Sequence, residues 1–187
     1  MGVNDVYKGK KLNRDDFLEQ IRRASDEEYK TEWDDFGRVG EQKKKSKMEK
    51  GAKSKARGGQ FELRVRKDLE EKGWIVDKWS NNLDLETKEI RAAKKKFNPF
   101  SKAMTIGTGF PDFVCFEKRG DLYKVIGVEV KMNGTLSLLE KNKCKLYLEK
   151  QIFNEILIAK KAKKIKKSNR VLIEYISFNE IEARMRK

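Results

Sequence analysis

The 187-residue chain contains no histidine, and this absence removes several kinds of site at once. Ser-His-Asp and Cys-His catalysis, imidazole general bases and histidine-ligated metals are all excluded. Any catalysis must therefore use carboxylates, lysine, tyrosine and metal ions that are held by oxygen ligands.

Cysteine and long apolar runs are also scarce. Cys115 and Cys144 are the only two cysteines, and their spacing fits neither a zinc site nor a disulfide framework. Each lies in an apolar pattern, so both are predicted to be buried thiols. No apolar run is long enough to span a membrane, and the start of the chain lacks a signal-peptide pattern. We expect a soluble intracellular protein, located in the cytoplasm, or in the host-cell cytoplasm if the source is viral.

Basic residues are abundant and unevenly distributed. Lysine and arginine number 45 against 30 acidic residues, giving a formal net charge of +15. Residues 13–36 carry four basic and nine acidic side chains, whereas residues 41–58 carry eight and two, and residues 141–167 carry ten and two. Such basic blocks are typical of proteins that bind polyanions, most often nucleic acid. A solvated, lysine-rich surface of a heat-stable protein is the alternative.

Two strand-like runs, residues 113–116 and 124–128, predict a β-hairpin. Gly120-Asp121 between them suits a two-residue loop. Counting outward from that loop, Asp112 falls opposite Glu129, with Cβ atoms roughly 4.5–5.5 Å apart. Lys131 lies two residues beyond Glu129 and so points to the same face. Two facing carboxylates repel unless a cation lies between them, so the hairpin predicts a site for a metal ion and a lysine.

These residue types fit phosphodiester hydrolysis. Asp112 and Glu129 would supply carboxylate oxygens to Mg²⁺, and the carbonyl of Val130 a third oxygen. The ion would polarise a phosphoryl oxygen and lower the pKa of an attacking water, while Lys131 would orient the water and offset negative charge. Read separately, each residue also has an ordinary structural explanation, since Asp112 opens a strand and the Glu129–Lys131 edge is solvated.

A fourth acid is predicted on the first helix of the main domain. Glu62 lies at the edge of that helix's apolar stripe, from which it would reach over the sheet towards the hairpin. The alternative is a first-turn glutamate that the helix dipole favours. The stripe itself consists of Phe61, Val65 and Leu69.

Residues 1–57 are expected to form an N-terminal helical extension: an acidic helix followed by a basic linker or arm. Asn13 and Asp16 would cap that helix, which runs into the twenties or thirties with Trp33 and Phe36 as further anchors. Residues 41–57 read as a basic linker or an exposed helix, either a solvated connector or a contact with phosphates.

Residues 58–187 are predicted to be an α/β domain, a small mixed sheet flanked by helices. The expected order begins with a helix that ends at Gly73, a strand at 74–79, a basic insertion around 81–108 and the hairpin. A long helix then follows, capped by Ser137 and Glu140 and continuing to Leu157. A strand at 170–176 and a short helix capped by Asn179 and Glu182 complete the domain. In the insertion, the candidate contacts to nucleic acid are Lys94, Lys95, Lys96, Phe97 and Phe100; a disordered charged insertion is the alternative.

The stretch Gly58-Gly59-Gln60-Phe61-Glu62, with Phe110-Pro111-Asp112 and Val128-Glu129-Val130-Lys131, resembles the PD-(D/E)XK nuclease superfamily. Within it, the chain looks most like archaeal Holliday-junction resolvases and related virus- or plasmid-borne nucleases, over roughly residues 58–176. The resemblance implies a restriction-endonuclease-like core in which Asp112, Glu129 and Glu62 hold Mg²⁺ or Mn²⁺ and Lys131 is the catalytic lysine. Ser80 matches, more weakly, a small polar residue that follows the first strand in resolvases.

By this resemblance the chain would be a homodimeric, Mg²⁺-dependent endonuclease acting on DNA, duplex or branched, in recombination, repair or replication. It departs from the resolvase pattern in three places. The segment 81–108 is longer, the long helix follows Lys131 without an intervening strand-like piece, and the first fifty-odd residues have no counterpart. Two other functions therefore stay open: a catalytically silent DNA-binding or regulatory module on the same fold, and an interaction protein that uses its acidic helix.

Overall fold

Residues 13–98, 103–106, 109–162 and 171–185 are described by the structure, a computed structural model of the whole chain. The chain divides into two units, Met1–Arg57 (unit 1) and Gly58–Lys187 (unit 2). None of the helices in the described residues is long and apolar enough to cross a membrane.

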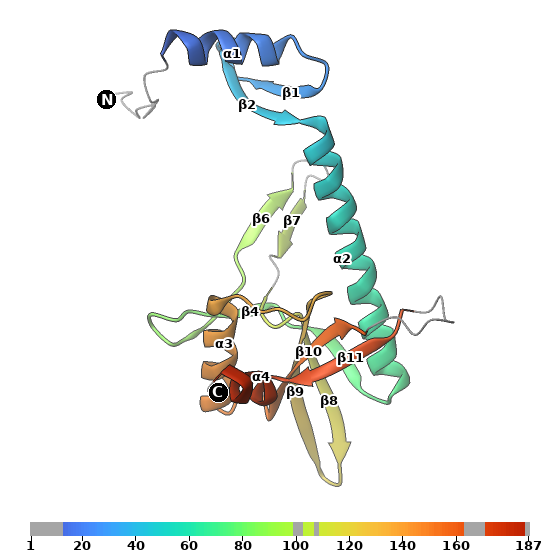
Figure 1. Cartoon of the computed structure of the whole chain (residues 1–187). Coiled ribbons are helices and arrows are strands. Elements are labelled where there is room, and N and C mark those ends of the chain that lie inside the picture. The colour runs from blue at the N-terminus through green and yellow to red at the C-terminus, as the bar shows by residue number, and fades with distance from the viewer. Residues whose placement is uncertain (1–12, 99–102, 107–108, 163–170, 186–187) are drawn as a thin grey trace. The chain divides into compact units, whose positions relative to one another are not determined.

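Unit 1 places a helix against a two-stranded ribbon. Helix α1 (Arg14–Ala24) begins as predicted, with the side chain of Asn13 accepting the Asp16 N–H at 2.7 Å. Strands β1 (Tyr29–Trp33) and β2 (Val39–Lys44) then pair antiparallel (Figure 1). Gln42 ties the ribbon to the helix, because its amide donates to the Gln20 carbonyl at 2.7 Å.

The prediction that Trp33 and Phe36 anchor helix α1 is wrong. The helix ends at Ala24, and the side chains of Trp33 and Phe36 are 58% and 78% exposed. Asp34 explains the change of structure: its carboxylate accepts the N–H groups of Phe36 and Arg38, so it closes a turn between two strands. A hairpin, β1 and β2, therefore stands between the acidic helix and the basic segment that was expected to follow it.

Helix α2 (Lys45–Glu71) is one continuous helix of 27 residues. The sequence left two structures open for the basic segment 41–57, a linker or an exposed helix. From Lys45 onward the segment is an exposed helix. Gly58 lies inside the helix and does not begin it. The predicted end is confirmed: Gly73 has a φ of +88°, and the Trp74 N–H donates to the Leu69 carbonyl at 3.1 Å.

Unit 2 is built on a mixed five-stranded sheet, which agrees with the predicted α/β class. Its strand order is β11-β10-β9-β8-β3, with β9 and β10 parallel and every other pair antiparallel. The strands are β3 (Ile75–Lys78), β8 (Phe113–Arg119), β9 (Leu122–Val130), β10 (Glu155–Lys161) and β11 (Ile173–Ser177).

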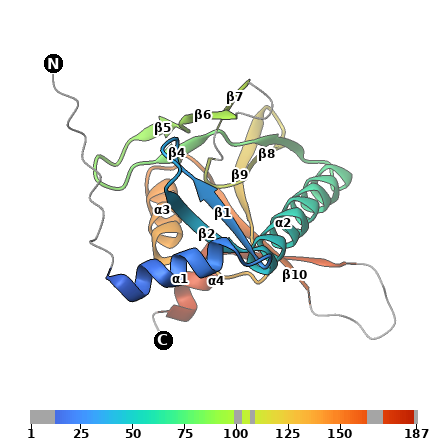
Figure 2. The ribbon, with the colours of Figure 1, turned by 90° about the horizontal axis from the view of Figure 1, so that it is seen from above.

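Helices cover both faces of this sheet (Figure 2). One face packs against α2; this cluster contains Phe61, Val65, Leu69, Cys115 and Val128. The other face packs against α3 (Leu138–Glu149) and α4 (Phe178–Met185); this cluster contains Val114, Cys144, Tyr147, Ile158 and Phe178. The predicted apolar stripe of the first helix and the burial of both cysteines are confirmed.

Strand β10 was not predicted. The expected long helix stops at Glu149, Gln151 takes a positive φ of 55°, and Glu155–Lys161 forms a strand. The run Ile156–Ala159 is continuously apolar because both faces of β10 are covered, and such a run does not distinguish a strand from a helix by its period. The last strand and helix exist, but α4 already begins at Phe178, so Asn179 lies inside it rather than capping it.

The insertion at 81–108 forms two short antiparallel ribbons where no regular structure was expected. Strand β4 (Asn81–Leu83) pairs with β5 (Ile90–Ala92), and β6 (Lys95–Asn98) pairs with β7 (Ala103–Ile106). Strands of three or four residues offer too little alternation to be recognised from the sequence.

Candidate functional site

The β8–β9 hairpin has the predicted register. Arg119 pairs with Leu122 and Phe113 with Val128, and Gly120 takes a φ of +62° in the loop. Asp112 immediately precedes β8, beside Glu129. Gly120 suits this loop because a positive φ is easily adopted only by a residue without Cβ.

Backbone N–H groups hold the carboxylates of Asp112 and Glu129 together. The Asp112 N–H donates to Glu129 Oε2 at 3.2 Å, and the Val130 N–H donates to Asp112 Oδ2 at 2.8 Å. Glu129 is 4% exposed. The structure thus brings the two predicted acids together at the open end of the hairpin, where β8 begins and β9 ends.

Lys131 lies between two glutamates. Its Nζ atom is 2.9 Å from Glu129 Oε1 and 2.6 Å from Glu140 Oε1. Glu140 also accepts the N–H of Ser137 at 2.7 Å, which completes the capping box of α3. From the sequence Glu140 had only this capping role. The spacing from Ser137 identifies the cap, but no sequence signal shows that α3 begins beside Lys131.

Glu62 projects from α2 and forms an ion pair with Lys78 of β3, with Oε2 and Nζ 3.3 Å apart. After burial, the charge of Glu62 also contributes to raising the pKa of Asp112. Lys78 was not identified from the sequence, where it reads as an ordinary exposed strand residue.

Burial is the largest influence on the pKa values of this cluster, and hydrogen bonds and neighbouring charges follow. Burial, and then the charge of Asp112, raises the pKa of Glu129 to about 7. Burial also raises the pKa of Asp112, and the hydrogen bond from Val130 opposes that rise. For Lys131 burial acts in the opposite sense, but hydrogen bonds to Glu140 and Glu129 dominate and raise its pKa.

The cluster has more acids than cations. Four carboxyl groups (Glu62, Asp112, Glu129, Glu140) meet two ammonium groups (Lys78, Lys131) at this end of the sheet. In the part of the chain that the structure describes, no three acidic or cysteine side chains are arranged to hold a metal ion. The ion pairs with Lys78 and Lys131 engage carboxylate oxygens that such an ion would need. The Val130 backbone contacts Asp112 through its N–H.

Of the other predicted site residues, those that the structure describes lie outside this cluster of contacts. Ser80 is exposed, and it follows Trp79, whose N–H donates to the Asp112 carbonyl at 3.2 Å. Lys94 and Lys95 are exposed, and Phe97 on β6 is 61% exposed. The side chain of Lys96 and the whole of Phe100 lie outside the described residues.

Comparison of the chain with protein-family models, with curated proteins and with solved structures gives no match.

Proposed function

We propose that the chain is a metal-dependent endonuclease that hydrolyses phosphodiester bonds of DNA. The observation that supports this most strongly is the close grouping of Asp112, Glu129 and Lys131 on one edge of the hairpin. Two adjacent carboxyl groups, one buried and one half-buried, are unfavourable in a fold unless a positive charge compensates them, and a lysine beside them suits chemistry on a phosphate.

Carboxylate oxygens are the donor type that a hard divalent cation prefers, and binding such an ion here would have to displace the ion pairs with Lys78 and Lys131. Asp112 and Glu129 would hold Mg²⁺ or Mn²⁺ through carboxylate oxygens, with Glu62 and the Val130 carbonyl as further ligands. Such an ion supplies Lewis acidity, which polarises the phosphoryl oxygen and activates a bound water. A bound divalent ion would favour the ionised forms of Asp112 and Glu129, whose pKa values burial raises in the metal-free chain.

Lys131 would act on the phosphate through its charge. Its contacts with Glu129 and Glu140 keep it protonated, so it would stabilise the negative charge that develops on the phosphoryl oxygens. Glu140 would be a positioning residue, since its own carboxylate is fixed by the cap of α3. A homodimer that cuts both strands of a branched DNA is the finer form of the proposal.

Cleavage of linear, flapped and four-way DNA in Mg²⁺ tests the proposal, with Glu129→Gln and Lys131→Ala as site variants. We expect each variant to lower the cleavage rate by about a hundredfold or more, because a group that stabilises the transition state is lost. The matched controls are Glu155→Gln and Lys124→Ala. They break a 2.9 Å ion pair between β9, the strand that carries Glu129, and β10, away from the site, and should cleave at the wild-type rate.

Three results would contradict parts of the proposal. Products that persist in both site variants would remove the active-site assignment. A wild-type chain that binds DNA but never cleaves it would be a binding module. Equal cleavage of all three substrates, or a monomer by sedimentation, would remove only the resolvase-like form.

A further inference from the structure

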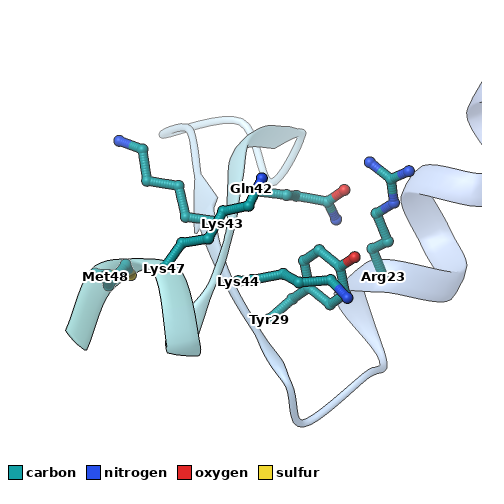
Figure 3. Close-up of a pocket in the computed structure, with 7 residues that line it drawn as sticks. All are labelled: Arg23, Tyr29, Gln42, Lys43, Lys44, Lys47 and Met48. Atoms are coloured by element: carbon teal, nitrogen blue, oxygen red, sulfur yellow. The ribbon is translucent and has the colours of Figure 1, made fainter. Parts of the chain in front are cut away.

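A basic pocket lies within unit 1, separate from the acidic cluster of unit 2. It has a volume of about 660 Å³, and none of its seven lining residues is acidic. Figure 3 shows its walls: Arg23 from the end of α1, Tyr29 and Lys44 from the paired strands, and Lys47 from the first turn of α2. Cationic side chains from three elements, α1, β2 and α2, therefore line one pocket.

Two of these cations flank one aromatic ring. The Arg23 guanidinium lies 5.7 Å from the centroid of the Tyr29 ring, and Lys44 Nζ lies 5.3 Å from it. The acids that pair with them, Glu19 and Glu28, are not among the lining residues. Both cationic side chains are 44% exposed, so their charges remain available to a ligand. An anion bound in the pocket would be attracted by both charges.

The positive charge continues beyond the pocket along α2. At 100° per residue, the side chains of four basic residues lie within about 120° of one another on the helix and extend for about 15 Å along it. They are Lys47, Lys50, Lys53 and Arg57, all exposed. Within residues 41–58 only Glu41 and Glu49 are acidic. A cationic surface of this length suits a chain of phosphates better than a single anion.

We infer that unit 1 binds the phosphate backbone of DNA in this pocket and along this face of α2, without reading the base sequence. The choice of DNA among polyanions rests on the proposed function. The contact does not depend on cleavage, because the residues that make it are all in unit 1. Ammonium and guanidinium groups of this kind contact phosphates and release counterions when they bind.

The test measures binding of the full chain, in EDTA, to a fluorescein-labelled DNA duplex of mixed sequence over a range of salt concentrations. The pocket variant is Arg23→Ala with Lys44→Ala. The control is Arg22→Ala with Lys30→Ala, which removes the same amount of charge. Arg22 is the exposed neighbour of Arg23 and pairs with the same Glu19. Lys30 points away from Tyr29, because neighbouring residues of a strand face opposite sides. Thermal unfolding of both variants verifies that they fold.

We expect the pocket variant to bind about tenfold more weakly at ~0.1 M salt, with a log–log salt slope shallower by about 2, while the control changes far less. Equal weakening in both would mean that only net charge matters and would overturn the inference. Unchanged duplex binding in the pocket variant would also overturn the inference. This holds even if the binding of the variant to phosphatidylserine vesicles falls. Absent cleavage with retained, pocket-dependent binding would refute the nuclease proposal and leave this inference intact.

Discussion

At the scale of single residues, Glu129 is the buried charged residue of the described part of unit 2. It is 4% exposed, its carboxyl group lies beside a second carboxyl group, and its positive neighbour Lys131 is shared with Glu140. An arrangement of this kind stabilises the protonated form of Glu129 relative to the ionised form. Ionisation of this buried acid therefore opposes the stability of the fold.

The stability of the fold should therefore depend on pH, and unfolding measurements detect this dependence. Because the pKa of Glu129 rises from 4.5 to about 7 on folding, the folded chain keeps a proton that the unfolded chain has lost over that range. The free energy of unfolding of the metal-free protein should therefore fall as pH rises from about 4.5 to about 7. We expect the Tm of wild type in EDTA to fall more across this range than that of Glu129→Gln. Parallel Tm profiles for the two proteins would contradict the burial of an ionisable Glu129.

Glu140 makes two contacts, and only one of them can be recognised from the sequence. The sequence identifies its part in the capping box, which needs only the three-residue spacing from Ser137. Its contact with Lys131 at 2.6 Å depends on where α3 begins relative to the end of β9. A local pattern specifies the first contact but contains no information about the second.

At the scale of elements, the absence of a side chain at Gly127 lets the segment before the hairpin pack closely against strand β9. A Cβ added to Gly127 would lie 2.8 Å from Pro111 Cγ and 3.3 Å from the ring of Phe153. Gly127 thus allows Pro111 to pack against β9, and Pro111 directly precedes Asp112. The glycine therefore helps to determine where this acid lies.

Gly127→Ala should destabilise unit 2 by about 1–3 kcal/mol, because the added methyl group overpacks the contact with Pro111. Gly59→Ala is the matched control: it lies in α2 with no atom within 4 Å of an added Cβ, and should stabilise by up to about 1 kcal/mol. Denaturant unfolding measures both changes. A neutral Gly127→Ala would mean that the segment around Pro111 moves freely, and Asp112 with it.

The predicted elements differ in how local their signals are. The β8–β9 register was predictable because the loop residues and the strand alternation fix it within one short segment. Strand β10 was missed because it is covered on both faces and lacks alternation, and the two ribbons between 81 and 106 were missed because their strands are too short. Helix α2 continues past the glycines at 58 and 59, where propensity alone favours an end.

At the scale of the whole molecule, the two thiols report on opposite faces of one sheet. Cys115 belongs to the cluster under α2 and Cys144 to the cluster under α3. Burial raises the pKa of Cys115 to about 12 and raises that of Cys144 as well. If unit 2 unfolds cooperatively, both thiols should become reactive in the same transition.

We therefore expect native protein at neutral pH to react with a thiol reagent roughly a thousandfold more slowly than unfolded protein, because little thiolate is present. In a denaturant series, the reactivity of both thiols should rise together with the loss of circular dichroism. The single variants Cys115→Ser and Cys144→Ser assign each signal. One thiol that reacts well before the other would show that the two faces of the sheet open separately.

The sequence by itself determined the features that neighbouring residues fix: the absence of histidine chemistry, the basic blocks, the cap of α1, and the hairpin that sets Asp112 beside Glu129. Only the tertiary structure decided the contacts between distant elements. These are the Lys78–Glu62 pair, the second contact of Glu140, the fifth strand of the sheet and the basic pocket of unit 1. The physical reason is that turn chemistry and strand alternation act over a few residues, whereas these contacts depend on how whole helices and strands pack.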